Sequence, residues 1–323
     1  MREVTFIRAL NEALAEELKR DGNVFLVGED IADCGGVFGV TAGMLKRFGH
    51  KRVRQTPISE AAFTGLAVGA AMTGLRPVCE IMYVDFTTVC MDQIINQAAK
   101  LRYMSGGQLT IPMTLRTQQG GGTCEAAQHS QCFEAWFAHV PGLKVVMPSC
   151  PADAKGLLKS AIRDDNPVIF LEHKLIYGEK GPLPSGEHVV PLGVADVKRE
   201  GTDITVIATS LMVGRALAAA EELAAEVSVE VMDPRTLVPL DMDCIAASVE
   251  KTGRLLVVQE ACQSGGFGSE IVRRVCERCW GALKCAPKVL GGRDIPMPFS
   301  PALEPLCAPG VADVVGGVRG MVG

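Results

Sequence analysis

The chain has 323 residues, of which 48% are hydrophobic and 21% are charged, so it is too long for one small core and suits two domains of ordinary size. Its net charge is -5 and it has no run of lysine or arginine, so it offers no footprint for nucleic acid and no basic patch for an anionic membrane. Metabolites and other proteins are the partners that this composition favours.

The N-terminal stretch, residues 1–22, has apolar residues at helical spacing with charges between them, and it predicts an amphipathic helix and not a signal peptide. The longest apolar stretch, roughly residues 61–75, contains threonines and glycines and is too short to span a bilayer. The 12 cysteines are scattered without regular pairing, as is typical of a reducing compartment. We therefore expect a cytoplasmic protein without a membrane segment.

Short apolar runs bounded by turn residues alternate with helical stretches, which is the pattern of helices packed on a parallel sheet. In the first half these runs are VFLVGED (24–30), RPVCEIM (76–82), LTIPMTLR (109–116), LKVVMPS (143–149) and NPVIFLEH (166–173). Glycine, proline and charge interrupt the alternation at residues 179–193 for longer than a normal loop, which predicts a domain linker.

The alternation resumes after this linker. The predicted strands there are residues 203–210, 227–234, 254–261 and 288–292, and the predicted helices are about 212–225, 241–252 and 267–279. The sequence thus predicts an α/β fold of two domains, residues 1–185 and 186–323, each a mainly parallel sheet with helices on both faces.

Ligands of open parallel sheets bind beyond the carboxyl ends of the strands, so the loops that follow strands are the places to search for a site. Three such segments contain chemically capable residues: TPISEAAFTG with Glu60, YVDFTTVCMDQ with Phe86, and TQQGGGTCEAAQHSQ with His129. Glu60 is a single carboxylate that begins a nearly apolar stretch, and a carboxylate that loses its water there needs a partner or keeps its proton.

Several standard motifs are missing. The chain has no G-x-x-x-x-G-K-S/T loop, no G-x-G-x-x-G after a strand and no G-x-S-x-G nucleophile elbow. Cys276 and Cys279 have the C-x2-C spacing of a zinc site, but the surrounding apolar period is that of a helix and no second pair follows, which favours two core cysteines.

A family resemblance becomes specific at TPISEAAFTGLAVGAAMTGLRPVCEIMYVDF, DQIINQAAKLRYMSGG, AAQHSQCFEAWFAHVPGLKVVMPS and DAKGLLKSAIRDDNPVIFLEHKLIYG. These segments resemble the β subunits of E1-type, thiamine-diphosphate-dependent dehydrogenases, which are the β chains of the pyruvate, branched-chain 2-oxo acid and acetoin dehydrogenase complexes. The resemblance covers nearly the whole chain, because DPRTLVPLDMDCIAASVEKTGRLLVVQE in the second half agrees in order and spacing. It implies a pyrimidine-binding domain at residues 1–185 and a transketolase C-terminal-like domain at 186–323.

The resemblance also implies roles for individual residues. Glu60 would face N1′ of the cofactor's aminopyrimidine and share a proton with it, and Phe86 would stack on the pyrimidine face. Met82 would line the same pocket or fill a gap in the core. His129 would act near the reacting carbonyl and in acyl transfer to a lipoyl group. The plain alternatives are a helix N-terminal acid for Glu60, a core ring for Phe86 and an ordinary loop residue for His129.

Partners and ions are implied in the same way. No GDG motif occurs in this chain, so the diphosphate and its Mg2+ would be held by an α subunit in an α2β2 heterotetramer, which passes its acyl product to a lipoyl acyltransferase, E2. Some members of the family bind a potassium ion, and that site maps onto Met113, Ala161, Ile162, Asp164 and Asn166. The alternative for these residues is an ordinary helix C-terminus.

The substrate is open at this stage. MYVDF and EHKLIYG are more similar to acetoin dehydrogenase β chains, whereas RYMSGG and AAQHSQCFEAW are more similar to pyruvate dehydrogenase β chains. We favour pyruvate or acetoin over a branched-chain 2-oxo acid. A transketolase-like ketol-transfer half-enzyme and a non-catalytic E2-binding subunit are the two alternatives, and the AAQHSQ stretch and the intact Glu60, Phe86 and His129 argue against them.

Overall fold

The computed structural model describes residues 1–323, which divide into two compact units. Unit 1 contains residues 1–119 and 136–192, and unit 2 contains residues 120–135 and 193–323. The last change of unit, between residues 192 and 193, thus falls at the end of the predicted linker, 179–193. The loop with His129, which the sequence assigns to the first domain, belongs to unit 2.

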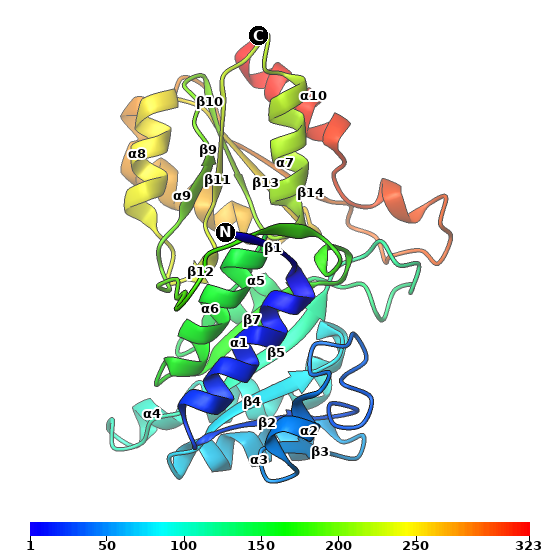
Figure 1. The fold of residues 1–323 in the computed structure, drawn as a ribbon. Coiled ribbons are helices and arrows are strands. Elements are labelled where there is room, and N and C mark those ends of the chain that lie inside the picture. Colours follow the sequence, from blue (N-terminus) through cyan, green and yellow to red (C-terminus); the bar gives the residue numbers. More distant parts are fainter. The chain divides into compact units, whose positions relative to one another are not determined.

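Unit 1 is an α/β unit (Figure 1). Its strands are β1 (Arg2–Thr5), β2 (Val24–Gly28), β3 (Val53–Gln55), β4 (Arg76–Ile81), β5 (Thr114–Gln119), β6 (Lys144–Val146), β7 (Val168–His173) and β8 (Lys180–Leu183). Its helices are α1 (Phe6–Arg20), α2 (Met44–Phe48), α3 (Glu60–Met72), α4 (Leu101–Met104) and α6 (Pro151–Arg163), with 3-10 turns at Val84–Cys90 and Lys174–Ile176 and a π-helical turn at Gln93–Ala98. The helix α5 (Glu134–Ala138) contains the first residues after the change from unit 2 to unit 1.

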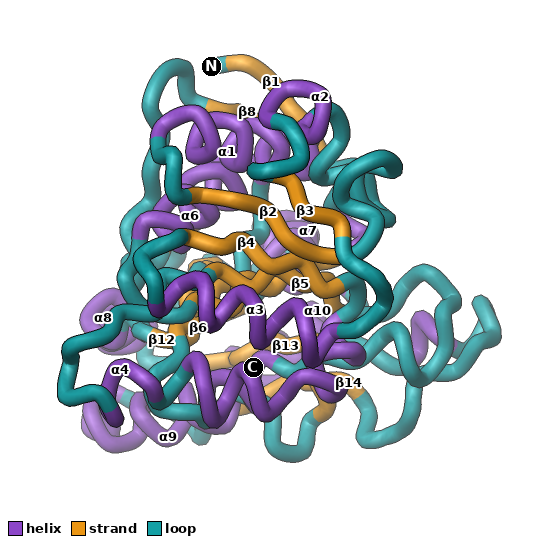
Figure 2. Tube along the Cα trace, turned by 90° about the horizontal axis from the view of Figure 1, so that it is seen from below, coloured by secondary structure: helices purple, strands orange, loops and turns teal.

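The main sheet of unit 1 is parallel, with its strands in the order β6-β7-β5-β4-β2-β3. Figure 2 shows β2, β4 and β5 side by side. The chain moves across the sheet in one direction from β6 to β7 and in the other from β3 to β4, so right-handed crossovers place α6 and α3 on opposite faces. The helix α1 packs along α6. Strands covered on both faces are buried throughout, as β2 and β7 are.

Two boundaries in unit 1 differ from the prediction. The N-terminal helix begins at Phe6 and not at Met1, because β1 pairs antiparallel with β8 and the side chain of Thr5 accepts a hydrogen bond from the Arg8 N–H at 3.3 Å. The strand predicted over 109–116 begins only at Thr114, since Pro112 cannot donate to a strand ladder.

Unit 2 repeats the α/β pattern. Its strands are β9 (Asp196–Arg199), β10 (Ile204–Ala208), β11 (Val229–Asp233), β12 (Thr236–Val238), β13 (Leu255–Cys262) and β14 (Lys288–Gly292). Its helices are α7 (Leu211–Glu222), α8 (Met242–Thr252), α9 (Gly268–Cys279) and α10 (Val311–Val322), with 3-10 turns at Trp280–Ala282 and Glu304–Leu306.

The sheet of unit 2 has the order β14-β13-β10-β11-β9 and is parallel except for the edge strand β9, which is antiparallel to β11. Figure 1 shows α7 and α10 on one side of this sheet and α8 and α9 on the other. A core of buried aliphatic side chains joins α7 and α10 to the sheet. Both units are mainly parallel sheets flanked by helices, so the predicted fold class is confirmed.

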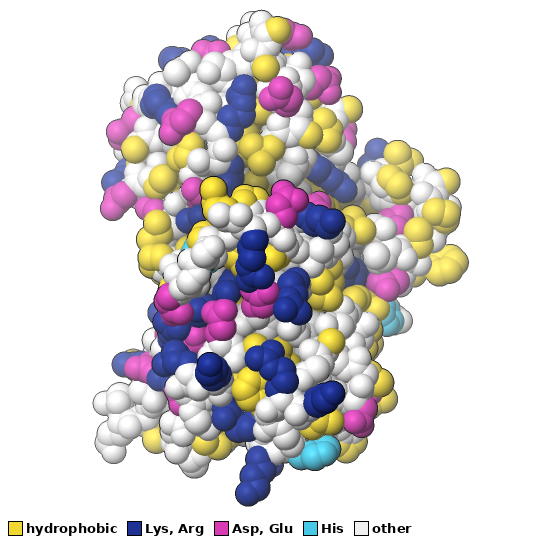
Figure 3. Space-filling model, in the orientation of Figure 1, with side chains coloured by type: hydrophobic (Ala, Val, Ile, Leu, Met, Phe, Trp, Pro, Cys, Tyr) yellow, Lys and Arg dark blue, Asp and Glu magenta, His cyan; other side chains and the backbone are white.

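The surface and the cysteines fit these two units. Figure 3 shows positive and negative side chains intermixed over α1 and α6. All 12 cysteines are free thiols, and Cys279 is buried on α9 while Cys276 lies half-buried on the same helix, so the core interpretation of this pair holds. No group of three His, Cys, Asp or Glu side chains could hold a metal ion. No helix has the length and apolar character needed to cross a membrane; the cytoplasmic location stays a prediction.

Candidate functional site

Three of the predicted site residues gather where neighbouring strands of unit 1 end. Glu60 is the first residue of α3, which follows β3. Met82 directly follows β4, and Phe86 lies in the 3-10 turn that comes next. Because β2, β3 and β4 are parallel neighbours, these residues lie at the same edge of the sheet. All three side chains are half-buried, which leaves part of each available to a ligand.

The surroundings of Glu60 differ from the expectation that this carboxylate loses most of its water. The residues before it are open, since Ile58 is 84% exposed, and the apolar helix that it begins leaves Leu66 49% exposed. Apolar residues therefore follow Glu60 in the sequence without enclosing it in this chain. The position itself, in the first turn of a helix, favours the charged form of an acid through the helix dipole.

Glu29 is a second carboxylate at this edge, and the sequence analysis missed it. It directly follows β2, is only 8% exposed, and its Oε1 has no hydrogen-bond partner. Burial and the negative charges of Glu60 and Asp30 raise the pKa of Glu29, while the backbone N–H of Ser59 acts in the opposite direction. The two carboxylates interact, so a change in the charge of Glu60 changes the proton affinity of Glu29. Its place after the strand VFLVG was the signal that could have identified it.

The ring of Phe86 is held by a chain of aromatic contacts. It meets Tyr83 edge-on, with centroids 6.2 Å apart and an interplanar angle of 73°. Tyr83 meets Phe38 in the same way at 5.4 Å, and the ammonium group of Lys174 lies 5.0 Å from the centre of the Tyr83 ring. Tyr83 has a φ of 63°, a left-handed conformation that is strained for a bulky residue. These contacts fix the turn that carries Phe86.

A buried ionic network lies in the same sheet. Arg116 on β5 is fully buried and binds Glu172 on β7 through two parallel hydrogen bonds of 2.7 and 2.8 Å, while its Nη1 donates to Glu80 on β4 at 2.6 Å. The hydroxyl of Tyr177 donates to Glu172 at 2.5 Å. Burial raises the pKa of Glu80, against the attraction of Arg116. The network ties three adjacent strands together near their carboxyl ends, and the alternating polar residues of TLRTQQ were its only sequence signal.

His129 lies in unit 2, on the loop between β5 and α5, and its side chain is half-buried. The backbone N–H of Gly120 donates to the carbonyl of Gln131 at 3.1 Å, so the ends of the loop are joined. The histidine thus belongs to a closed loop with its ring partly open to solvent, as the polar and glycine-rich sequence predicts.

The predicted potassium site lies at the C-terminal end of α6 and the segment before β7, and Met113, just before β5, joins it because its carbonyl accepts a hydrogen bond from the Val168 N–H at 2.9 Å. The five residues of the site are Met113, Ala161, Ile162, Asp164 and Asn166. The carbonyl oxygens of Ile162 and Asp164 both accept hydrogen bonds from Nη1 of Arg76, at 3.2 and 3.0 Å. The Asp164 carboxylate pairs with Lys144 and accepts from Asn166 at 2.9 Å. Partial burial alone would raise the pKa of Asp164, but the hydrogen bonds from Lys144 and Asn166 lower it. Cationic side chains therefore already satisfy part of this oxygen cluster.

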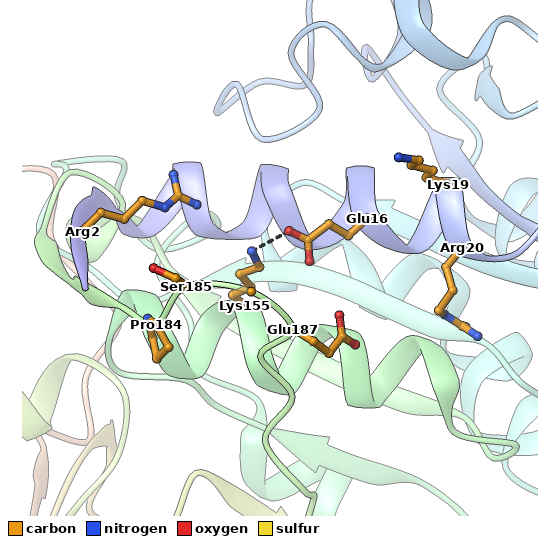
Figure 4. Close-up of a pocket in the computed structure, with 9 residues that line it drawn as sticks. Arg2, Glu16, Lys19, Arg20, Lys155, Pro184, Ser185 and Glu187 are labelled. Carbon is orange, nitrogen blue, oxygen red and sulfur yellow. Dashed lines mark hydrogen bonds and ion pairs between the residues drawn. The ribbon is translucent and has the colours of Figure 1, made fainter.

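A groove of about 570 Å3 lies elsewhere on unit 1, between α1, α6 and the loop after β8 (Figure 4). Among its cationic side chains, Lys155 contacts Glu16 at 2.6 Å, and Arg2 pairs with Glu12. The groove contains none of the predicted site residues.

The residues at the carboxyl edge of unit 1 fit one part of thiamine diphosphate. A half-exposed aromatic ring offers a stacking surface for a flat heterocycle. The partly exposed Glu60 and the buried, unpartnered Oε1 of Glu29 offer acceptors for polar hydrogens. Burial favours the protonated form of Glu29, and the partly exposed carboxylate of Glu60 can accept or return a proton at a ring nitrogen.

Comparison with known proteins shows the family of the chain. The family model of the transketolase pyrimidine binding domain matches residues 2–180, and that of the transketolase C-terminal domain matches residues 193–314. The chain is 46% identical, over 98% of its length and 97% of the relative's, to the β subunit of an acetoin:2,6-dichlorophenolindophenol oxidoreductase of Cupriavidus necator.

Two further relatives are equally similar. The β subunit of the pyruvate dehydrogenase E1 component of Rhizobium meliloti is 46% identical over 99% of the chain and 70% of the relative, and that of the 2-oxoisovalerate dehydrogenase of Bacillus subtilis is 47% identical over 93% of both. Among solved structures, a split-gene transketolase described as an inactive β4 tetramer aligns with a TM-score of 0.82 at 22% identity, over 99% of this chain and 98% of that one. This structural likeness shows a shared fold.

Proposed function

The chain belongs to the family of E1 β subunits of thiamine-diphosphate-dependent dehydrogenase complexes, and on that premise we propose that it forms the pyrimidine-binding half of such an active site. The other half, with the diphosphate and its Mg2+, belongs to an α subunit in an α2β2 heterotetramer. The observation that carries this proposal is the group of Glu60, Glu29 and Phe86 at one sheet edge, in a chain that matches E1 β subunits over nearly its full length.

When bound, thiamine diphosphate supplies the electron sink for breaking the bond next to the substrate carbonyl. Glu60 holds a proton at N1′ of the aminopyrimidine, and Phe86 orients the ring by stacking on its face. Glu29 and Glu60 interact electrostatically, because the negative charge of Glu60 raises the pKa of Glu29. Met82, which directly follows β4, would line the same pocket. The chain's part is thus to hold the pyrimidine and to supply one movable proton.

His129 is proposed to act later, in acyl transfer to the lipoyl group of an E2 acyltransferase. A half-buried imidazole on a loop is partly open to solvent and can donate or accept a proton at a reacting oxygen or sulfur. His129→Ala should therefore reduce transfer to lipoyl groups more than it reduces decarboxylation measured with an artificial electron acceptor. Equal, small losses in both assays would mean that His129 is an ordinary loop residue without a role in acyl transfer.

The reaction proposed is oxidative decarboxylation of pyruvate or cleavage of acetoin, in preference to a branched-chain 2-oxo acid. The relatives named for acetoin, pyruvate and 2-oxoisovalerate are 46%, 46% and 47% identical, so overall identity does not rank them. Much of the substrate pocket belongs to the α subunit. Steady-state assays of the assembled enzyme with the three substrates, compared by kcat/KM, decide between them.

The decisive experiment measures thiamine diphosphate binding by calorimetry, first with this chain alone and then with its α subunit added. We expect weak or no binding to the single chain and clear binding to the mixture. Micromolar binding by the single chain would contradict a shared site. The alternative of a transketolase-like half-enzyme rests on the fold alone; ketol transfer between sugar phosphates by the assembled protein would support it.

A further inference from the structure

The loop that carries His129 has a strained backbone. Between its joined ends at Gly120 and Gln131, Cys124 has a φ of 56° and Ala126 a φ of 62°. These values lie in the left-handed region, which residues with a side chain populate sparsely. Such a backbone persists only where its surroundings fix it, so the contacts that hold this loop decide where His129 lies.

Glu304 supplies the main polar contact to this strained segment. Its Oε1 accepts a hydrogen bond from the backbone N–H of Gly122 at 2.8 Å, and its Oε2 accepts one from the N–H of Cys124 at 2.9 Å. The residue is 5% exposed, and these are charge-assisted hydrogen bonds to an ionised group. Backbone N–H groups that converge in this way form a concave anion site, here occupied by a side chain of the same unit.

Two further contacts hold the start of the loop. Glu260 on β13 accepts a hydrogen bond from the N–H of Gly121 at 2.8 Å. The segment that carries Glu304 also packs directly on the loop, because a Cβ at Gly121 would lie 2.8 Å from the end of the Met297 side chain and 3.4 Å from Glu304 Oε1. In Figure 1 this segment is the orange-red excursion between β14 and α10.

We propose that Glu304 is a positioning residue for His129: its carboxylate holds the Gly122–Cys124 backbone in the conformation that sets the histidine's place. The histidine follows Cys124 by five residues within the same closed loop. This inference rests on the proposed role of His129 in acyl transfer. In this proposal, Glu304 contacts neither substrate nor cofactor and acts only by holding the loop.

The specific requirement at position 304 is a side chain with two acceptor oxygens. Glutamine has nearly the same shape, but its amide nitrogen is a donor and cannot accept from either N–H. Glu304→Gln therefore loses one of the two hydrogen bonds and places two donors face to face. Cys124→Gly should compensate in part, because glycine adopts a positive φ without steric cost and the loop then depends less on the carboxylate.

The experiment uses the assembled complex of this chain with its α subunit and measures amide hydrogen exchange across residues 120–135 by mass spectrometry, with decarboxylation and lipoyl acyl transfer assayed in parallel. In the wild type, the amides of Gly122 and Cys124 should be protected. In Glu304→Gln they should exchange about tenfold faster. Acyl transfer should fall towards the His129→Ala level while decarboxylation with an artificial acceptor is largely kept, and Cys124→Gly in the same background should restore part of the transfer.

Glu226→Gln is the matched control, since Glu226 is an exposed acid of unit 2 whose carboxylate pairs with Arg319 at 2.9 Å; it should change neither exchange nor transfer. Unprotected amides at Gly122 and Cys124 in the wild type would overturn the proposal, and this measurement needs no variant to fold. Normal acyl transfer in Glu304→Gln beside a clear loss in His129→Ala would also overturn it. Normal transfer in His129→Ala itself would instead refute the proposed role of the histidine.

Discussion

Replacing Glu60 by glutamine tests the proposed chemistry most directly, because the change keeps the size and polarity of the side chain and removes its basic site. If Glu60 holds a proton at the pyrimidine, the variant cannot do so. The loss of a positioned acid or base costs roughly 10² to 10⁴ in rate, which corresponds to about 3 to 5 kcal/mol in the barrier. Cofactor binding should fall only modestly, since in the proposed shared site the diphosphate contacts belong to the α subunit.

If Glu60 is only an acid at the N-terminus of a helix, Glu60→Gln should have a much smaller effect on the rate. Glu60 is the first residue of α3 and is half-buried, so as a simple partner of the helix dipole it contributes about 0.3 to 1 kcal/mol to stability. Even if that energy appeared entirely in the barrier, the rate would change only about twofold to fivefold. Asp313→Asn is a matched control, because Asp313 lies in the first turn of α10 and accepts from the Gly310 N–H at 2.8 Å.

The assay is hydrogen/deuterium exchange at C2 of the cofactor in the assembled enzyme, which measures proton removal before any substrate step. An unchanged exchange rate in Glu60→Gln would refute the assignment. A second measurement needs only the isolated chain: the charge of Glu60 contributes to the raised pKa of Glu29, so an NMR titration of Glu29 in the variant should give a lower pKa than in the wild type.

Three further predictions concern the neighbouring groups. The pKa of Glu29 is raised in the folded chain, so between pH 4.5, the ordinary pKa, and this raised value the folded chain keeps a proton that the unfolded chain has lost. The free energy of unfolding therefore falls as pH rises through this range. In denaturant titrations, Glu29→Gln should remove this fall. Arg116→Met should cost about 3 to 5 kcal/mol of unfolding free energy in such titrations, because it leaves Glu80 and Glu172 buried with their charges unpaired. If potassium occupies the oxygen cluster around Asp164, replacing choline by potassium at constant ionic strength should raise the unfolding midpoint by a few degrees.

Each of these predictions has a result that contradicts it. A pH dependence of stability that persists in Glu29→Gln would place the titrating group elsewhere. Arg319→Met is the control for Arg116→Met, since Arg319 forms an exposed ion pair that contributes little to stability. Equal losses of unfolding free energy in the two variants would contradict a special role of the buried network. Identical midpoints in potassium and choline would leave Arg76 and Lys144 as the only cations at Asp164.

The sequence alone determined the alternation of strands and helices in both units. Residues 24–30, 76–82 and 166–173 were predicted as buried strands, and they form β2, β4 and β7. This succeeds because a parallel strand covered on both faces must be almost continuously apolar, which is visible in a single segment. Glu60, Phe86 and His129 were likewise singled out because their segments follow predicted strands, and the family resemblance implied their roles. The edge strand β9, which pairs on one side only, left no such signal and was missed.

Tertiary structure decided what no local pattern contains. Glu29 belongs to the site because β2 and β3 are neighbours, which places its carboxylate near Glu60, 31 positions later in the chain. The contact of Glu304 with the loop of His129 joins residues about 180 positions apart. Burial also depends on the fold, which is why Glu60 begins an apolar segment and still reaches solvent. The periodicity of apolar residues in the sequence shows which face of a helix or strand is apolar. The proton affinity of a carboxylate depends instead on the charges and dipoles of other segments that lie near it in the fold.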